Sequence, residues 1–232
     1  TGVWNPATDR DIAATYTAKT LDKRIINKRA VEKRFGLDED DGILHCVVSR
    51  LTWQKGMDIF ATSLDALVAS GARLALIGTG EPAIEKSIIG AAHYHKGRIG
   101  IVTAYDEVLS HLMQAGCDTI LVPSRFEPCG LTQLYGLRYG CVPVVARTGG
   151  LADTIIDAND AALAAGVATG FQFSPVDGPS LEHAISRAGS IPTARPGAIC
   201  RSAGWRAMSR GTTAAPNTQN SIATSSSPEP SA

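Results

Sequence analysis

The sequence lacks several features that would assign a protein to a class at once. It has no net charge, because 22 Lys and Arg residues balance 22 Asp and Glu residues. A neutral chain has no long-range field that would hold nucleic acid or an anionic membrane surface, so any anion site must be local. No apolar run approaches the roughly 18 residues that a membrane-spanning helix needs. We therefore expect neither a nucleic-acid partner nor a membrane partner.

Cysteine is scarce and follows no pattern. The cysteines are odd in number, widely spaced and without any C-x-x-C pair: Cys46, Cys117, Cys129, Cys141 and Cys200. This spacing argues against a disulfide framework and against a zinc site, so we expect a reducing, cytoplasmic compartment and no bound metal. The chain also begins at Thr1 without a Met. We therefore expect that it is a fragment cut at its front.

Short runs of branched apolar residues recur between segments with helical spacing. They predict buried strands, the last one weaker, at residues 43–49, 73–77, 99–102, 119–122, 142–146 and 170–173. Because the connecting segments are helical, the strands are expected to be parallel, in an α/β fold with an open sheet and helices on both faces. From residue 188 onward, large apolar residues almost disappear. We assign 1–187 to the folded domain and 188–232 to a low-complexity tail that is disordered or frameshifted.

Ligands of open parallel sheets bind beyond the carboxyl ends of the strands, in the loops that lead into helices. The first such loop reads S-R-L-T-W-Q-K-G and places Arg50 and Lys55 five residues apart. Two cations at this position, in front of a helix N-terminus, would clamp a diphosphate. A pair of solvated surface cations is the alternative. The position of the loop directly after a buried strand favours the anion site.

Two further loops carry weaker signals. The Gly78-Thr79-Gly80 segment would let the backbone approach a ligand closely, although a plain tight turn explains it equally well. Tyr105, after the third strand, could stack on a flat base, and a half-buried core tyrosine is the equal alternative. The residues themselves leave both questions open.

The richest loop follows the fourth predicted strand. In it, Glu127 precedes a Pro-Cys-Gly turn, and the turn opens a helix whose free N–H groups and Thr132 hydroxyl could receive phosphate oxygens. Glu127 would then face the same cleft, or it would simply cap the following helix. Cys129 is a poor candidate for a nucleophile, because no histidine lies in its loop. The loop therefore predicts a phosphate site with a carboxylate beside it.

Several stretches together resemble bacterial glycogen synthase over residues 2–185. They are W-N-P-A-T-D from Trp4, S-R-L-T-W-Q-K-G from Ser49, P-S-R-F-E-P-C-G-L-T-Q-L-Y-G-L from Pro123 and R-T-G-G-L-A-D-T from Arg147. The resemblance implies an enzyme with two Rossmann-like domains in the GT-B arrangement. Such an enzyme transfers glucose from ADP-glucose to the 4-hydroxyl of a growing α-1,4-glucan with retention of configuration. This chain resembles the second domain, which binds the nucleotide-sugar donor.

The same resemblance implies roles for individual residues. Arg50 and Lys55 match the catalytic cations that stabilise the departing diphosphate, and Glu127 matches the catalytic carboxylate near the donor glucose. The turn with Cys129, Gly130, Leu131 and Thr132 matches the substrate-binding phosphate cradle. Tyr105 resembles the residue on the adenine side.

The resemblance also implies what accompanies this domain. ADP-glucose is then the substrate, and neither a metal nor another cofactor is expected. The α-glucan acceptor would bind through a first domain that this chain lacks, so we expect the chain to bind ADP or ADP-glucose without completing catalysis alone. Two alternatives stay open: a non-catalytic nucleotide- or glucan-binding module, and another GT-B enzyme that uses a UDP-sugar.

Overall fold

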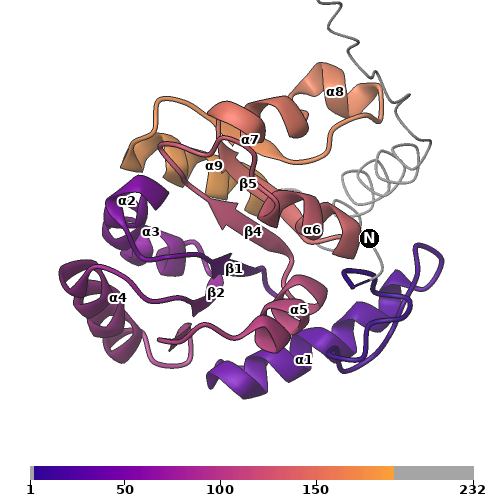
Figure 1. Ribbon diagram of the computed structural model, residues 1–232, viewed down its shortest axis with the longest axis horizontal. Helices are drawn as coiled ribbons and strands as arrows, with labels where there is room; N and C mark the ends of the chain where they lie inside the picture. Colours follow the sequence, from indigo (N-terminus) through magenta and orange to yellow (C-terminus); the bar gives the residue numbers. More distant parts are fainter. Residues whose placement is uncertain (1–2, 191–232) are drawn as a thin grey trace, which may run out of the picture.

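The computed structural model describes residues 3–190, and these residues form one open sheet with helices on both faces (Figure 1). The sheet has six strands in the order β3-β2-β1-β4-β5-β6, and every pairing is parallel. The strands are β1 (Leu44–Val48), β2 (Arg73–Ile77), β3 (Ile99–Val102), β4 (Thr119–Val122), β5 (Val142–Ala146) and β6 (Phe171–Phe173). The six predicted strands and the predicted α/β class are thus confirmed.

Helices connect consecutive strands and cover the sheet. They are α1 (Arg24–Phe35), α2 (Met57–Thr62), α3 (Leu64–Ala69), α4 (Pro82–Tyr94), α5 (Glu107–Gly116), α6 (Thr132–Tyr139), α7 (Gly149–Thr154), α8 (Asp160–Ala164) and α9 (Gly178–Ser190), with short 3-10 turns at Leu21–Lys23 and Trp53–Lys55. None of the helices in the described part of the chain is long and apolar enough to cross a membrane.

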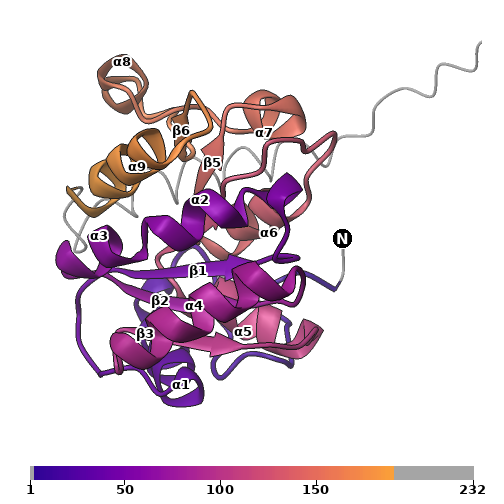
Figure 2. The ribbon, with the colours of Figure 1, turned by 90° about the vertical axis from the view of Figure 1, so that its left-hand side faces the viewer.

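The two faces of the sheet have separate apolar cores. One core joins the sheet to α2, α3, α4 and α9, through residues such as Val47, Phe60 and Leu181. The other joins it to α1 and α5, through Cys46 and Met113 among others. In Figure 1 α2, α3 and α4 lie on one side of the sheet and α1, α5 and α6 on the other, and Figure 2 looks onto the face that carries α2, α4 and α9. Alternate residues of β1 point to opposite cores, as a strand buried on both faces requires.

The strand order reverses at β1, which pairs with β2 on one side and with β4 on the other. The connection after β1 leads to β2 on one side, whereas the connection after β4 leads to β5 on the other, and this divergence opens a crevice beyond the carboxyl ends of β1 and β4. The loops that follow β1 and β4 flank this crevice. These are the loops that carry Arg50, Lys55 and Glu127.

The predicted boundary at residue 187 is wrong by at least three residues. Helix α9 continues to Ser190, and Ala188 is 7% exposed and packs in the same core as Leu181 and Ala184. The helical spacing of these small apolar residues carries the helix past the point where large apolar residues stop. The rest of the predicted tail, residues 191–232, lies outside the described residues.

Candidate functional site

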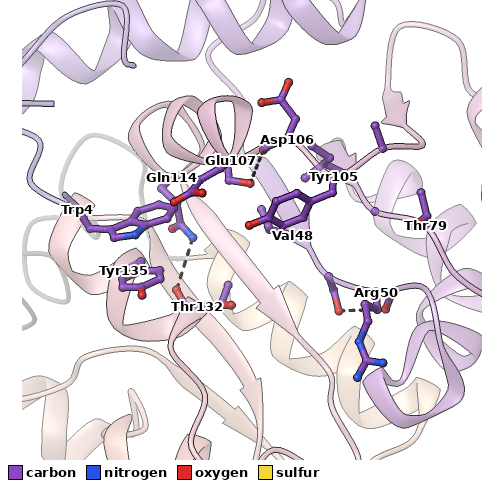
Figure 3. A pocket seen from close by; sticks show the side chains of 15 residues that line it. Trp4, Val48, Arg50, Thr79, Tyr105, Asp106, Glu107, Gln114, Thr132 and Tyr135 are labelled. Carbon is purple, nitrogen blue, oxygen red and sulfur yellow. Dashed lines mark hydrogen bonds between the residues drawn. The ribbon is translucent and has the colours of Figure 1, made fainter. Parts of the chain in front are cut away.

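A cavity of about 370 Å³ lies beyond the carboxyl ends of β1, β2 and β3, at the switch point of the sheet (Figure 3). Its wall comes from the loops after these three strands, from one side of α5 and the first turn of α6, and from Trp4 near the start of the chain. Three of the predicted site residues line it together: Arg50, Tyr105 and Thr132. The sheet thus brings together residues that lie far apart in the sequence.

Tyr105 and Arg50 both face solvent at this cavity. Tyr105 is 87% exposed, so the alternative of a half-buried core tyrosine is wrong. Its ring lines the cavity together with Val48 at the end of β1, and its exposure leaves a face open for a flat ligand (Figure 3). Arg50 is exposed, and no described residue forms an ion pair with it. This end of the site therefore offers a stacking surface and an unneutralised cation.

The Gly78-Thr79-Gly80 loop has a role that the sequence did not suggest. A Cβ on Gly78 would lie 1.9 Å from the carbonyl oxygen of Ser49, and one on Gly80 would lie 2.2 Å from that of Leu51. Neither glycine has a positive φ, so conformational freedom is not what they supply. They let the loop after β2 lie directly against the loop after β1. Glycine at these positions therefore shapes the cavity wall, where Gly78 and Thr79 both appear.

Lys55 and Glu127 lie outside the cavity lining and bind each other. Nζ of Lys55 is 2.5 Å from Oε2 of Glu127, and the side chains are 19% and 15% exposed. The hydroxyl of Ser124 donates to the same oxygen at 3.1 Å. The N-cap of α6 is Leu131, and no side chain makes a cap hydrogen bond there. The alternative that Glu127 caps α6 is therefore wrong, because its carboxylate is held by Lys55 and Ser124.

Arg125 connects the loops after β1 and β4, which carry this ion pair. Its guanidinium donates two hydrogen bonds to Asp58, at 2.5 and 2.8 Å, and one to the carbonyl oxygen of Trp53 at 2.7 Å. It also lies over the Trp53 ring, 4.5 Å from the centroid. The hydrogen bonds from Arg125 lower the pKa of Asp58. The two loops therefore hold Lys55 and Glu127 together before any ligand arrives.

The glycines of the R-T-G-G segment support the turn around Glu127. A Cβ on Gly149, whose φ is +45°, would lie 2.3 Å from the carbonyl oxygen of Glu127. One on Gly150 would lie 2.2 Å from that of Cys129, and the N–H of Gly150 donates to the Glu127 carbonyl at 3.0 Å. Cys129, Gly130 and Leu131 do not line the cavity. Cys129 and Leu131 are exposed at the entry to α6, and their substrate-binding role stays a prediction.

Comparison with known proteins assigns the family. Residues 28–190 match the family model described as "Glycosyl transferases group 1". The chain belongs to this family. Over 187 residues it is 65% identical to the glycogen synthase of Mesorhizobium japonicum, an alignment that covers 81% of this chain and 39% of that protein. This glycosyltransferase chain thus spans about two fifths of the length of the curated relatives that it matches.

Two solved structures show the same fold. The catalytic domain of starch synthase IV from Arabidopsis thaliana, bound to ADP and acarbose, has a TM-score of 0.79 and 30% identity over 90% of this chain and 45% of that one. The Anabaena protein HepE, in complex with UDP and glucose, has a TM-score of 0.61 and 19% identity over 79% of this chain and 47% of its own. The GT-B fold and the resemblance to bacterial glycogen synthase are therefore confirmed.

The candidate site includes residues that sequence reasoning missed. Trp4 and Tyr135 line the cavity and stack on each other, with ring centroids 4.2 Å apart and an interplanar angle of 2°. Tyr135 follows Thr132 by three residues, so helical spacing alone could have indicated it. Trp4 precedes the first strand. Trp4 therefore belongs to none of the loops after strands in which ligand residues are expected.

A buried network anchors Trp4. Its ring stacks on His111, with centroids 3.7 Å apart, and His111 is 2.7 Å from Oδ2 of Asp9. The same Asp9 oxygen accepts a hydrogen bond from the hydroxyl of Tyr139. Burial and the hydrogen bond to Asp9 raise the pKa of Tyr139. Asp9, Asp11 and His111 are close enough to hold a metal ion, but the carboxylate of Asp9 is occupied by His111, Tyr139 and the N–H of Asp11.

Proposed function

We propose that this chain is the donor-binding domain of a glycogen or starch synthase. The complete enzyme would transfer glucose from ADP-glucose to the 4-hydroxyl at the end of an α-1,4-glucan, with retention of configuration. The observation that carries the proposal is the cavity at the switch point, where Arg50, Tyr105 and Thr132 converge. The identity of 65% with a glycogen synthase and the likeness to a starch synthase bound to ADP support the same reaction.

The chemistry needs positive charge where the nucleotide leaves. When the glycosidic bond to ADP breaks, negative charge develops on the diphosphate and positive charge on C1 of the glucose. Arg50, Lys55 and the N-terminus of α6 with Thr132 would stabilise the diphosphate, which is the largest electrostatic contribution we assign. Neither a metal nor a cofactor is part of this proposal.

Glu127 would contact the glucose of the donor rather than its phosphates. Its Oε2 is held by Lys55 and Ser124, whereas Oε1 has no hydrogen-bond partner among the described residues. The unpartnered oxygen is available to a glucose hydroxyl or to the cationic C1. Lys55 holds the carboxylate and, in this proposal, would also contact the diphosphate, so departure of the diphosphate and stabilisation of the sugar would be coupled through one ion pair.

The remaining partners follow from the same proposal. The chain spans two fifths of its relatives, so the acceptor glucan would bind with the part of the enzyme that these 187 aligned residues do not include. We also propose a cytoplasmic location. Cys46, Cys117 and Cys141 are buried free thiols and Cys129 is an exposed one, which suits a reducing compartment.

Titration of ADP into the purified chain tests the proposal. We expect ADP to release binding heat and UDP to bind more weakly, with negligible glucose transfer unless the first domain is supplied. A folded sample that gives no heat with ADP would contradict the proposal. Stronger binding of UDP would favour an enzyme that uses a UDP-sugar. Glucan binding that is indifferent to ADP and unchanged in Glu127→Ala would favour a non-catalytic module.

A further inference from the structure

Gln133 is a fully buried polar residue that the proposed chemistry does not use. It is the second residue of α6 and follows Thr132 directly. It does not line the cavity, so its side chain cannot contact a ligand there. A buried carboxamide finds its hydrogen-bond partners within the chain. The partners of Gln133 therefore indicate its role.

Both hydrogens of this carboxamide are donated to groups around the turn at residues 127–130. Nε2 of Gln133 lies 3.0 Å from the carbonyl oxygen of Gly130 and 3.1 Å from Oγ1 of Thr154 in α7. The carbonyl oxygen can only accept, and the hydroxyl of Thr154 already donates to the carbonyl oxygen of Gly150 at 2.5 Å. The orientation of the carboxamide is therefore fixed, because both of its partners need a donor.

These contacts hold both ends of the turn. At its start, the carbonyl oxygen of Glu127 accepts a hydrogen bond from the N–H of Gly150 at 3.0 Å. At its end, the carbonyl oxygen of Gly130 accepts the hydrogen bond from Gln133. Thr154 connects the two ends, because it accepts from Gln133 and donates to Gly150. We call these four hydrogen bonds the turn network, which joins the start of α6 to α7.

Stability alone does not explain a glutamine at this position. Oε1 of Gln133 has no hydrogen-bond partner in the part of the chain that the structure describes, although it is fully buried. Such an oxygen lowers stability, and an apolar side chain of the same size would avoid this cost. The carboxamide also packs against the turn, since a Cβ on Gly130, whose φ is +61°, would lie 2.7 Å from Oε1. A costly buried group that fixes the adjacent backbone indicates a positioning role.

We propose that Gln133 and Thr154 are positioning residues, which set the distance between the two functional ends of the turn. One end carries Glu127, which would contact the glucose of the donor. The other end leads into the N–H groups at the start of α6, which would receive the diphosphate. These groups face opposite charges of one breaking bond, so their spacing has to be held during the reaction. This inference rests on the proposed function.

Titration of ADP and of adenosine into the full chain tests the turn network, with wild type and Gln133→Met. Methionine has a similar length and helix propensity and no hydrogen-bond donor. We expect Gln133→Met to bind ADP about tenfold more weakly, because a released turn no longer presents its N–H groups to the phosphates. Affinity for adenosine, which has no phosphate, should be unchanged. The free energy of unfolding should change little, since removal of the unpartnered oxygen offsets the lost hydrogen bonds.

Thr154 provides an independent test that does not alter Gln133. Thr154→Val keeps the shape of the side chain and removes the hydroxyl, whereas Thr154→Ser keeps the hydroxyl. We expect Thr154→Val to bind ADP about threefold more weakly, because Gln133 keeps its bond to Gly130 but the two ends of the turn are no longer connected. Thr154→Ser should bind ADP as wild type does. Equal affinities of these two variants would overturn the inference, even if Gln133→Met does not fold.

Gln172→Met is the matched control. Nε2 of Gln172 also donates to two acceptors at α7, the carbonyl oxygens of Ala152 and Ile155, and neither belongs to the turn at residues 127–130. This variant should keep the affinity for ADP. An equal loss in Gln172→Met and Gln133→Met would overturn the inference, and so would a loss in Gln133→Met that is as large for adenosine as for ADP. A folded wild type that binds neither ligand contradicts the proposed function itself.

Discussion

Arg50 and Lys55 come from one short loop, yet the structure gives them opposite surroundings. Arg50 is exposed at the cavity and has no ion-pair partner among the described residues. Lys55 is mostly buried, and its charge is neutralised by Glu127 at 2.5 Å. The side of the site with Arg50 and Tyr105 is open to solvent and to a ligand. The paired side, with Lys55–Glu127 and Arg125–Asp58, is assembled in advance.

This difference suggests a division of labour between the two cations. An unneutralised cation contributes its full charge to binding of an anion, whereas a neutralised one must share that charge with its partner. Lys55 is therefore better suited to positioning Glu127 and to stabilising the negative charge that develops on the leaving diphosphate. A site that is organised before the reaction needs little rearrangement when that charge appears.

The largest effect is expected from Gly56→Ala, which would break the paired side. Gly56 has φ of +70°, and a Cβ there would lie 2.0 Å from the carbonyl oxygen of Pro123 in the opposite loop. The two loops would have to separate, which we expect to lower the free energy of unfolding by about 3 kcal/mol. Urea denaturation measures this change. Gly189→Ala, where a Cβ meets no atom within 4 Å, is the control, and equal effects of the two variants would contradict the tight contact.

Arg50→Ala tests the open side. Arg50 has no ion-pair partner among the described residues, so its removal should weaken ADP binding about 10- to 100-fold, as the loss of charge-assisted hydrogen bonds costs about 1.5–3 kcal/mol. Calorimetric titration gives the affinity. The control is Arg34→Ala, since Arg34 is exposed on α1 and does not line the cavity. An unchanged affinity in Arg50→Ala would remove Arg50 from the phosphate site.

Lys55→Ala and Glu127→Gln sharpen the contrast between the cations. Lys55→Ala should weaken ADP binding less than tenfold, because the ion pair already neutralises that charge. Glu127→Gln releases the charge of Lys55 and should strengthen ADP binding about threefold, while it abolishes transfer in the complete enzyme. The same titration measures both. If Lys55→Ala costs as much affinity as Arg50→Ala, the proposed division of labour is wrong.

The smallest effect is expected for the Arg125–Asp58 contact, whose contribution to stability depends on pH. Hydrogen bonds from Arg125 lower the pKa of Asp58. The contact therefore stabilises the fold fully at pH values above the usual carboxyl pKa near 4, and this stabilisation is lost as the pH falls through the lowered pKa. Asp58 is 36% exposed, so solvent screening limits the gain to about 0.5 kcal/mol. Between pH 5 and about 3, the free energy of unfolding of Arg125→Met should fall less than that of wild type. Identical pH profiles of unfolding in wild type and variant would contradict this.

Much of the fold could be predicted, because local patterns decide it. Runs such as Leu-Ala-Leu-Ile in β2 are apolar on both faces, which only a doubly covered parallel strand accommodates. Ligands of open parallel sheets bind in the loops after strands, and this rule predicted Arg50, Tyr105 and Thr132 as site residues. The structure brings all three to one cavity. The end of α9 was missed because Ala188 and Gly189 are small, and small residues give a weak periodic signal.

The sequence by itself determined the class of fold, the loops that carry the site and the charged residues that those loops supply. Only the tertiary structure decided which of these groups meet. The pairing of Lys55 with Glu127 depends on the contact between two loops 72 residues apart, and that contact depends on glycines where a Cβ would collide. Trp4 and Gln114 reach the cavity through packing between distant segments. Periodicity reports on the neighbours of a residue along the chain, whereas partners across space depend on how the sheet and helices pack.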